Sequence, residues 1–406
     1  MKTLIKNIGL LAGIGDAVRK EGAAMSEVGC LQNAWLLIDG DKIADFGGLL
    51  PADADAIVDA AGGMVIPAFC DSHTHIVYAG SREQEFEDKI RGLSYAEIAA
   101  RGGGILNSAA LLHETSEDEL YRQSLERVRE MMAAGTGAIE IKSGYGLNTE
   151  DELKMLRVIR RISETVPAVL RATFLGAHAV PAGITKEAYV QKVCAEMIPA
   201  VAAEGLADFV DVFCEEGFFS VEDTASIIEA GVKYGLRPKL HANQLHVSGG
   251  VQVGVEHGAL SVDHLERTTP AEIACLKGKA TMPTMLPGAS FFLREPYGNA
   301  AGFIYEGLGI ALASDYNPGS SPAGDMRFVM ALGCIRMRLT PEQAFNAVTL
   351  NGAYAMGLSG EIGSIARGRI ANLILTKPSF NTLGSLAYLY RSPFIEKVFL
   401  KGRMQQ

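Results

Sequence analysis

His73 and His75 stand two residues apart at the end of an apolar run, VIPAFCDSHTHIVYAG, at residues 65–80. The chain has 8 histidines in all, and the packing of a buried strand gives no reason to place two of them so close together. Side chains two positions apart on a strand point to the same face. The pair therefore predicts two imidazoles that share one ligand, and a metal ion is the expected ligand.

Other apolar runs also end in a residue that can bind a metal or exchange a proton. These residues are His178, His241, His264 and Asp315. A single histidine at a strand end is most often a polar residue satisfied within the core, but five histidines and an aspartate together favour a metal site. Imidazole nitrogens with one carboxylate suit Zn²⁺ or Fe²⁺. Three nitrogens and one oxygen would leave room for a water, whose pKa such a metal lowers to about 7.

The elements that must position these residues alternate between strands and helices. Eight apolar runs are predicted strands: MVIPAFCDSHTH, GAIEIKSGY, RATFLGAH, FVDVFCE, RPKLHANQ, SVDHLE, ATMPTMLP and IALASD. Eight strands that alternate with helices over roughly 290 residues predict a (β/α)₈ TIM-like barrel, an α/β fold. Catalytic residues of this fold lie at the carboxyl ends of the strands. The predicted helix starts include capping boxes of Ser116 with Glu119, Thr149 with Glu152, and Thr340 with Gln343.

The two ends of the chain are rich in short β-like runs. Residues 34–47 predict a hairpin that turns at Asp39 and Gly40, and GSIARGRIANLILTK and FIEKVFLKGRM resume this pattern near the C-terminus. We therefore expect both ends to pack together as one small β-sandwich domain. The predicted bounds are 1–65 and 359–406 for this small domain and 66–358 for the catalytic barrel.

The composition limits the possible partners. The net charge is -10 at pH 7, which argues against nucleic acid and anionic membranes as partners. A small anionic substrate would have to be held by local basic groups. The six cysteines are scattered without a C-x-x-C pair, which is typical of reduced thiols in a cytoplasmic protein.

The number of metal ions depends on whether a bridging ligand is present. Barrels that hold two metals need a bridging carboxylate, often a carbamylated lysine on the fourth strand. Here that strand ends in FCEE, without a lysine. Glu215 could bridge two ions, but a paired structural carboxylate is the favoured interpretation, and Lys142 on the second strand is expected to be structural or to shape the substrate pocket. The sequence thus predicts one metal ion.

The chain resembles the imidazolonepropionase family of the metal-dependent amidohydrolase superfamily along almost its whole length. The most specific motifs are YAGSREQEFEDKIRGLSYAEIAARGGGIL, EIKSGYGLNTEDELKMLR, FLGAHAVP, DVFCEEGFFS, ALSVDHLE and SDYNPGSSP. The resemblance implies hydrolysis of the cyclic amide of 4-imidazolone-5-propanoate to N-formimidoyl-L-glutamate, a step of histidine degradation. It also implies one divalent or trivalent transition metal per subunit, Zn or Fe, and a homodimer.

The resemblance also assigns roles to residues of this chain. The implied metal ligands are His73, His75, His241 and Asp315, and the implied catalytic residues are His264 and Asp315. The implied substrate-binding residues are Arg82, Tyr145, His178, Asn317, Gly319 and Ser320. Gln244 is expected to bind the substrate as well, by hydrogen bonds only. Asp315 is expected to move the proton, and His264 to polarise the carbonyl.

Some of these residues have simpler explanations. Arg82 could grip the propionate in a fork or form a surface salt bridge with Glu83 or Glu85. The NPGSSP turn could offer backbone N–H groups to the substrate or be an ordinary β-turn. Residues 101–106, RGGGIL, are expected to form a mobile flap over the site.

Two other functions remain open alternatives. One is a nucleobase-type deaminase, which resembles this scaffold but protonates the ring with a glutamate three residues after the strand-five histidine. Gln244 stands at that position, and an amide cannot shuttle protons. The other is a catalytically silent barrel that serves as a scaffold, which the complete set of ligands argues against.

Overall fold

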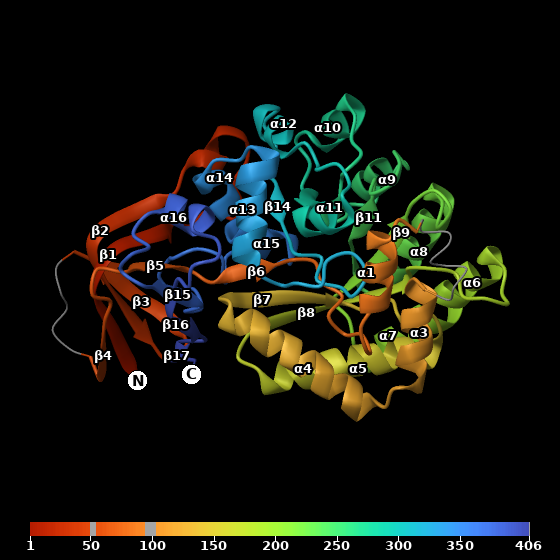
Figure 1. Ribbon diagram of the computed structural model, residues 1–406, viewed down its shortest axis with the longest axis horizontal. Helices are drawn as coiled ribbons and strands as arrows, with labels where there is room; N and C mark the ends of the chain where they lie inside the picture. The colour runs from red at the N-terminus through yellow and green to blue at the C-terminus, as the bar shows by residue number, and fades with distance from the viewer. Residues whose placement is uncertain (49–53, 94–102, 406) are drawn as a thin grey trace.

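The computed structural model describes residues 1–48, 54–93 and 103–405. They form a helix-covered barrel and, beside it, a separate sheet to which both ends of the chain contribute (Figure 1). The N- and C-termini lie near each other on this sheet. Within the described ranges, no helix combines the length and the apolar character that crossing a bilayer requires.

The barrel consists of eight parallel strands in the order of the chain. They are β6 (Phe69–Asp71), β7 (Thr136–Lys142), β8 (Val169–Ala177), β9 (Phe209–Cys214), β11 (Leu240–Ala242), β12 (Ser261–His264), β13 (Met282–Met285) and β14 (Ala311–Leu312), and the short β10 (Arg237–Pro238) pairs with β9. Every residue of β7 and β9 is buried, as expected for parallel strands covered on both faces.

The first and last barrel strands meet just beyond their ends, where Thr74 and Tyr316 form a parallel bridge. The amide of Asp315 donates to the carbonyl of His73 over 3.1 Å, and the amide of His75 donates to the carbonyl of Tyr316 over 2.9 Å. These bonds nearly close the barrel, so the predicted (β/α)₈ fold is confirmed.

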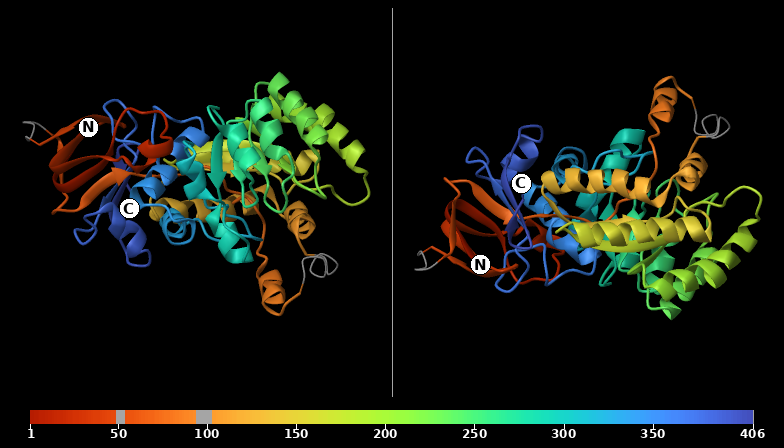
Figure 2. Two further views of the ribbon diagram at one scale, coloured as in Figure 1. Left: turned by 90° about the horizontal axis from the view of Figure 1, so that it is seen from above. Right: turned by 90° about the horizontal axis from the view of Figure 1, so that it is seen from below.

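Helices follow the strands around the barrel (Figures 1 and 2). They are α1 (Glu83–Ile90), α3 (Ile105–Glu114), α4 (Glu117–Ala133), α5 (Thr149–Thr165), α6 (Lys186–Lys192), α7 (Ile198–Glu204), α8 (Val221–Lys233), α9 (Gly250–Glu256), α10 (Pro270–Leu276), α11 (Pro287–Leu293), α12 (Ala300–Tyr305), α13 (Met326–Met337), α14 (Pro341–Val348), α15 (Leu350–Ala355) and α16 (Leu383–Tyr388). The described residues also include a 3-10 turn (Gly22–Ser26) and a π-helical turn (Val193–Met197). Of these elements, α1 projects from the body of the barrel (Figure 2).

Of the three predicted capping boxes, one is complete and one is formed only in part. The hydroxyl of Ser116 accepts from the amide of Glu119 at the start of α4, and Thr340 and Gln343 form a complete box at α14. The box predicted at Thr149 is wrong, because Asn148 caps α5 instead. Asparagine is as good a cap as threonine, and Glu152 is used elsewhere, in the loop that precedes the helix.

The separate sheet joins both ends of the chain, as predicted. Its strands are β1 (Lys2–Ile14), β2 (Gly29–Asp39), β3 (Lys42–Gly47), β4 (Ala56–Asp59), β5 (Met64–Pro67), β15 (Leu373–Thr376), β16 (Ile395–Leu400) and β17 (Arg403–Met404). The hairpin between β2 and β3 turns at Gly40 and Asp41, one residue later than predicted. The bounds between the two domains remain a prediction.

The predicted first barrel strand is two strands in the structure. β5 pairs with β1 and β15 in the separate sheet, whereas β6 pairs with β7 in the barrel. Pro67 ends β5 and the amide of Ala68 donates to the carbonyl of Asn372 over 2.9 Å, which carries the chain from one sheet to the other.

Candidate metal centre and active site

Three imidazole rings converge at the carboxyl end of the barrel. Nε2 of His75 lies 3.2 Å from Nε2 of His73 and 3.2 Å from Nε2 of His241. Oδ1 of Asp315 lies 3.6 Å from Nε2 of both His73 and His75. All four side chains are buried. The four residues that the resemblance assigns as ligands are therefore brought together by β6, β11 and the end of β14.

The spacing of these atoms fits a metal ion. Tetrahedral ligands at a metal–nitrogen distance of about 2.0–2.1 Å are separated from one another by about 3.3 Å, close to the 3.2 Å and 3.6 Å seen here. Burial, followed by neighbouring charges, holds the pKa values of His73 and His75 well below the usual range. Burial likewise lowers the pKa of His241 to about 3. The rings are thus neutral at pH 7, as metal ligands must be.

Two buried aspartates orient two of these rings. Oδ2 of Asp263 lies 2.7 Å from Nδ1 of His73, and Oδ2 of Asp211 lies 3.0 Å from Nδ1 of His241. The Asp263 carboxylate accepts the Nδ1 proton of His73, so Nε2 of His73 is the nitrogen that carries a lone pair toward the site. Sequence analysis missed both aspartates, although a charged residue inside each of the apolar runs FVDVFCE and SVDHLE was a usable signal.

A network of buried charges lies beneath the ligands. Nζ of Lys142 lies 2.7 Å from Glu140 and 2.8 Å from Asp211, and Nζ of Lys239 lies 2.6 Å from Glu140. Burial lowers the pKa of Lys142, but Asp211 and Glu140 outweigh it and raise the pKa above its ordinary value. Lys142 therefore supports the ligand shell from below, consistent with the structural role predicted for it.

Asp315 and His264 face the same space from neighbouring sides. His73, His264 and Asp315 form a second cluster whose ligand atoms lie within 4.8 Å of one another. Burial raises the pKa of Asp315 to about 6, and the Ser320 hydroxyl donates to its Oδ2 over 3.1 Å. Nδ1 of His264 lies 3.3 Å from Oε1 of the buried Glu266. Asp315 and His264 are thus placed to act on one molecule bound in this space.

A cavity of about 450 Å³ opens above this cluster. Its lining includes every substrate-binding residue that the resemblance assigns, and these are Arg82, Tyr145, His178, Gln244, Asn317, Gly319 and Ser320. His75, His241, His264 and Asp315 also line it. The cavity therefore joins the metal cluster to all of the predicted substrate positions.

Arg82 is not on the surface, although it does pair with a glutamate. Its Nη2 lies 2.6 Å from Oε2 of Glu85, and each side chain is only 8% exposed. The other oxygen of Glu85 accepts from the amide of Gly104 over 2.8 Å. Residues 101 and 102 of the predicted flap lie outside the described residues. The buried ion pair fixes the guanidinium at the cavity wall. Arg82 therefore pairs with Glu85, but this salt bridge is buried and not on the surface.

The loop after β7 carries Tyr145 and is held by Glu152. The Glu152 carboxylate accepts from the amides of Gly144, Gly146 and Leu147 over 3.1, 2.8 and 2.9 Å. Nδ1 of His178 donates to the carbonyl of Gly144 over 2.9 Å. Burial lowers the pKa of His178 to about 4, so this ring is neutral and its tautomer is set by the loop.

Two backbone amides of the turn after Asp315 are bonded within the turn itself. Oδ1 of Asn317 accepts from the amides of Gly319 and Ser320, each over 2.8 Å. Asn317, Gly319 and Ser320 all line the cavity, and their binding of substrate stays a prediction. The Asn317 amide group donates to the carbonyl of Asp315 over 2.7 Å, so the turn fixes the aspartate.

The sequence did not predict several residues that line the cavity, and it left two possible roles for Glu215. Lys89, Phe213, Phe218, Leu245 and Leu293 also line the cavity. Glu215 accepts from the amides of Leu245 and His246 over 2.9 and 3.1 Å, so it acts as a paired structural carboxylate, as the favoured interpretation expected. The apolar wall was not predictable, because phenylalanine and leucine also fill ordinary cores.

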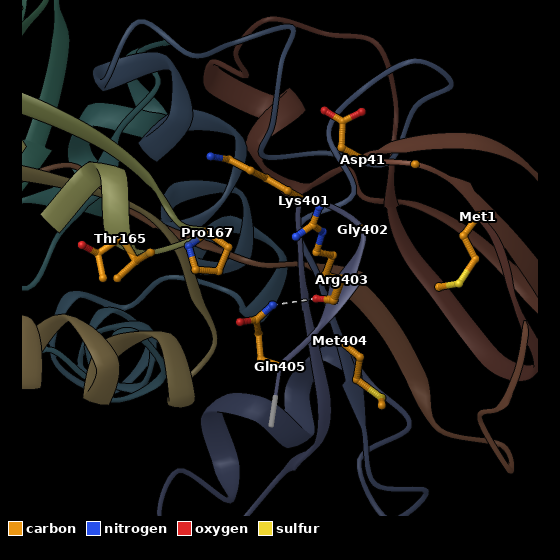
Figure 3. Close-up of a pocket in the computed structure, with 11 residues that line it drawn as sticks. Met1, Asp41, Thr165, Pro167, Lys401, Gly402, Arg403, Met404 and Gln405 are labelled. Carbon is orange, nitrogen blue, oxygen red and sulfur yellow. Dashed lines mark hydrogen bonds between the residues drawn. The ribbon is translucent and has the colours of Figure 1, made fainter. Parts of the chain in front are cut away.

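A larger cavity, of about 750 Å³, lies at the junction of the sheet and the barrel (Figure 3). Its lining comes from three segments, Gly40 with Asp41, Thr165 to Pro167, and Lys401 to Gln405, together with Met1. The close-up shows these side chains spread around the junction without converging on one point (Figure 3). None of its lining residues is a histidine, and none of the candidate site residues lines it.

The chain is similar to known proteins along its whole length. Residues 220–404 match the model of the amidohydrolase family. The chain is 54% identical to the imidazolonepropionase of Flavobacterium johnsoniae and 51% identical to that of Christiangramia forsetii, over the full length of each protein. A triazine hydrolase variant superposes with a TM-score of 0.76 at 14% identity, over 99% of this chain and 94% of its own. At that identity, the likeness is one of fold alone.

Proposed function

Because the chain belongs to the imidazolonepropionase family of amidohydrolases, we propose that its barrel cavity hydrolyses 4-imidazolone-5-propanoate to N-formimidoyl-L-glutamate. One observation carries the proposal. At the floor of a cavity, Nε2 of His75 lies 3.2 Å from Nε2 of both His73 and His241, and Oδ1 of Asp315 lies 3.6 Å from Nε2 of both His73 and His75. The wall of the same cavity holds a buried arginine, which suits a substrate with a hydrolysable ring and a carboxylate arm.

One transition-metal ion, Zn or Fe, is the cofactor we propose for this site. His73, His75, His241 and Asp315 would hold it, and all four lie in the buried cluster. A metal in such a site polarises the substrate carbonyl and lowers the pKa of water. The absence of a lysine at the end of β9 and the structural use of Glu215 support one ion over two.

The residues of the chain would then move the protons. Asp315 would take a proton from the attacking water. It would give that proton to the ring nitrogen as the bond between this nitrogen and the carbonyl carbon breaks. His264 would stabilise the negative charge that develops on the carbonyl oxygen.

The remaining residues would select and orient the substrate. Arg82 would bind the propionate through a charge-assisted hydrogen bond from its fork. Tyr145 and His178, whose rings lie 5.5 Å apart, would flank the planar ring. Gln244 would hydrogen-bond to the ring without exchanging a proton.

The deaminase alternative receives less support than the hydrolase. Gln244 cannot replace the glutamate that would protonate a nucleobase, and a buried arginine at the cavity wall favours an anionic substrate. The scaffold alternative does not explain why the set of ligands and its supporting aspartates are complete.

Two further features belong to this proposal. All six cysteines are free thiols, which supports a reducing compartment, the cytoplasm. A homodimer remains a prediction that sedimentation velocity would test.

The function itself is tested by incubating the metal-loaded protein with freshly prepared 4-imidazolone-5-propanoate and following the loss of its ultraviolet absorbance.

A further inference from the structure

We propose that Lys89 is a second cation for the propionate arm, and that Lys89 and Arg82 together set the specificity of the cavity for an anionic substrate. This inference rests on the proposed function and adds a substrate-binding residue to it. Arg82 and Lys89 belong to one helix, α1, and both contact Gly319.

Arg82 and Lys89 reach the cavity from one face of α1. Arg82 is the N-cap of the helix, and Lys89 lies in its last turn. Positions seven apart complete about two turns of an α-helix, so their side chains lie on the same face. Both residues line the cavity of about 450 Å³.

Gly319 brings the charged ends of these side chains to one place. Nζ of Lys89 donates to the carbonyl of Gly319 over 2.9 Å. A Cβ added at Gly319 would lie 2.2 Å from Nη1 of Arg82, so the guanidinium is in close contact with the same residue. Gly319 and Ser320 are among the lining residues, so the two cations point at the part of the cavity where a substrate arm would end.

The charges of the two cations are not balanced equally. Arg82 is paired with Glu85, whose carboxylate also accepts from Gly104. Among the described residues, Lys89 has no ion pair, and one hydrogen bond to a carbonyl leaves two of its three N–H donors free. Burial and the nearby Arg82 lower the pKa of Lys89, and the Glu85 carboxylate, which is paired with Arg82, offsets this only in part. A carboxylate bound between Lys89 and Arg82 would supply a further anion.

A purely structural role is the competing explanation, since Lys89 also holds the loop of Gly319. The two roles differ in how they depend on ligand charge. A structural lysine affects anionic and neutral ligands alike, whereas a carboxylate-binding lysine affects only the anionic one.

Direct binding to metal-loaded protein separates these roles without requiring turnover. The probes are 3-(imidazol-4-yl)propanoate and its neutral primary amide, with dissociation constants from titration calorimetry. We expect Lys89→Met to weaken binding of the propanoate about ten-fold, the usual scale of one hydrogen bond to a charged group, and to leave binding of the amide unchanged. Lys89→Arg should recover part of the loss. Arg91→Gln is the matched control, since Arg91 lies at the end of the same helix and its side chain is 64% exposed.

Equal weakening of both probes, or no change in either, would overturn the proposal. Unfolding temperatures check that each variant is folded. If Lys89→Met is not folded, the ratio of the dissociation constants of the propanoate and the amide is measured for Lys89→Arg alone. The result is independent of the proposed reaction: wild-type protein that binds the propanoate selectively but does not hydrolyse imidazolonepropanoate would contradict the function and leave the role of Lys89 intact.

Discussion

Oδ2 of Asp263 lies 2.7 Å from Nδ1 of His73, and both side chains are fully buried. The contact fixes the tautomer of the imidazole, because the carboxylate accepts the Nδ1 proton and leaves the lone pair on Nε2. The same aspartate lies 3.7 Å from Nζ of Lys142 and 3.9 Å from Nζ of Lys239. The ligand shell is therefore set by charges one layer deeper in the barrel.

Replacing this aspartate should weaken metal binding. Asp263→Asn keeps the shape but gives His73 a weaker acceptor, so we expect the affinity for the metal to fall about 10–100-fold. Competition with a chromogenic chelator measures the affinity. Asp118→Asn, an exposed aspartate paired with Arg161, is the control and should bind metal as the wild type does. An unchanged affinity in Asp263→Asn would remove the orienting role from this residue.

The number of metal ions follows from the single cluster at the cavity floor. Protein purified without added metal should contain about one transition-metal ion per chain. His241→Ala should lose most of that metal, because it removes one of three nitrogens. Elemental analysis of both proteins is the measurement, and two tightly held ions per wild-type chain would contradict the mononuclear site.

Arg82→Ala should raise KM strongly while metal content stays intact. Loss of one hydrogen bond to a charged group costs roughly 1.5–3 kcal/mol, which corresponds to about a ten- to hundred-fold fall in kcat/KM. Arg82→Lys should recover only part of it, because lysine lacks the planar fork. Steady-state kinetics of the two variants give the changes in KM and kcat/KM. Unchanged kinetics in Arg82→Ala would leave Arg82 with only its structural pairing to Glu85.

His264 and Gln244 line the same cavity but should differ in what their loss changes. A donor to a developing oxyanion is usually worth about 10²–10³ in kcat, so His264→Ala should lose about that much with metal retained. Gln244→Ala should lose less, mainly in KM, because an amide only orients the ring. kcat and KM of both variants, with metal content checked, are the readouts. A greater loss of kcat in Gln244→Ala would reverse the two roles.

Much of this arrangement could be predicted from strand patterns. Most barrel strands are short apolar runs that end in polar residues, so His73, His75, His241 and Asp315 could be assigned to one rim before any contact was known. The split of the first strand was signalled by Pro67, which cannot donate to a ladder, but the run continued in apolar residues on both sides.

Other features depend on contacts between side chains that the sequence does not show. Asn148 and Thr149 are both good N-caps, and only the fold shows that Asn148 is used. The amides of Gly319 and Ser320 looked free because nothing in the sequence shows that Oδ1 of Asn317 turns back to them. Lys89 was overlooked as one of many charged residues, although its spacing from Arg82 puts both on one helical face.

The most direct test of the whole account is hydrolysis of 4-imidazolone-5-propanoate by protein of known metal content. The substrate must be freshly prepared, and its ultraviolet absorbance is followed beside an assay for N-formimidoyl-L-glutamate. Asp315→Asn, which has no group to carry the proton, is the control at the same protein concentration. We predict that wild-type protein with about one metal ion per chain converts the substrate to this product, and that Asp315→Asn does so hardly faster than the spontaneous reaction. Metal-loaded wild-type protein that leaves the substrate to decay at its spontaneous rate would contradict the account.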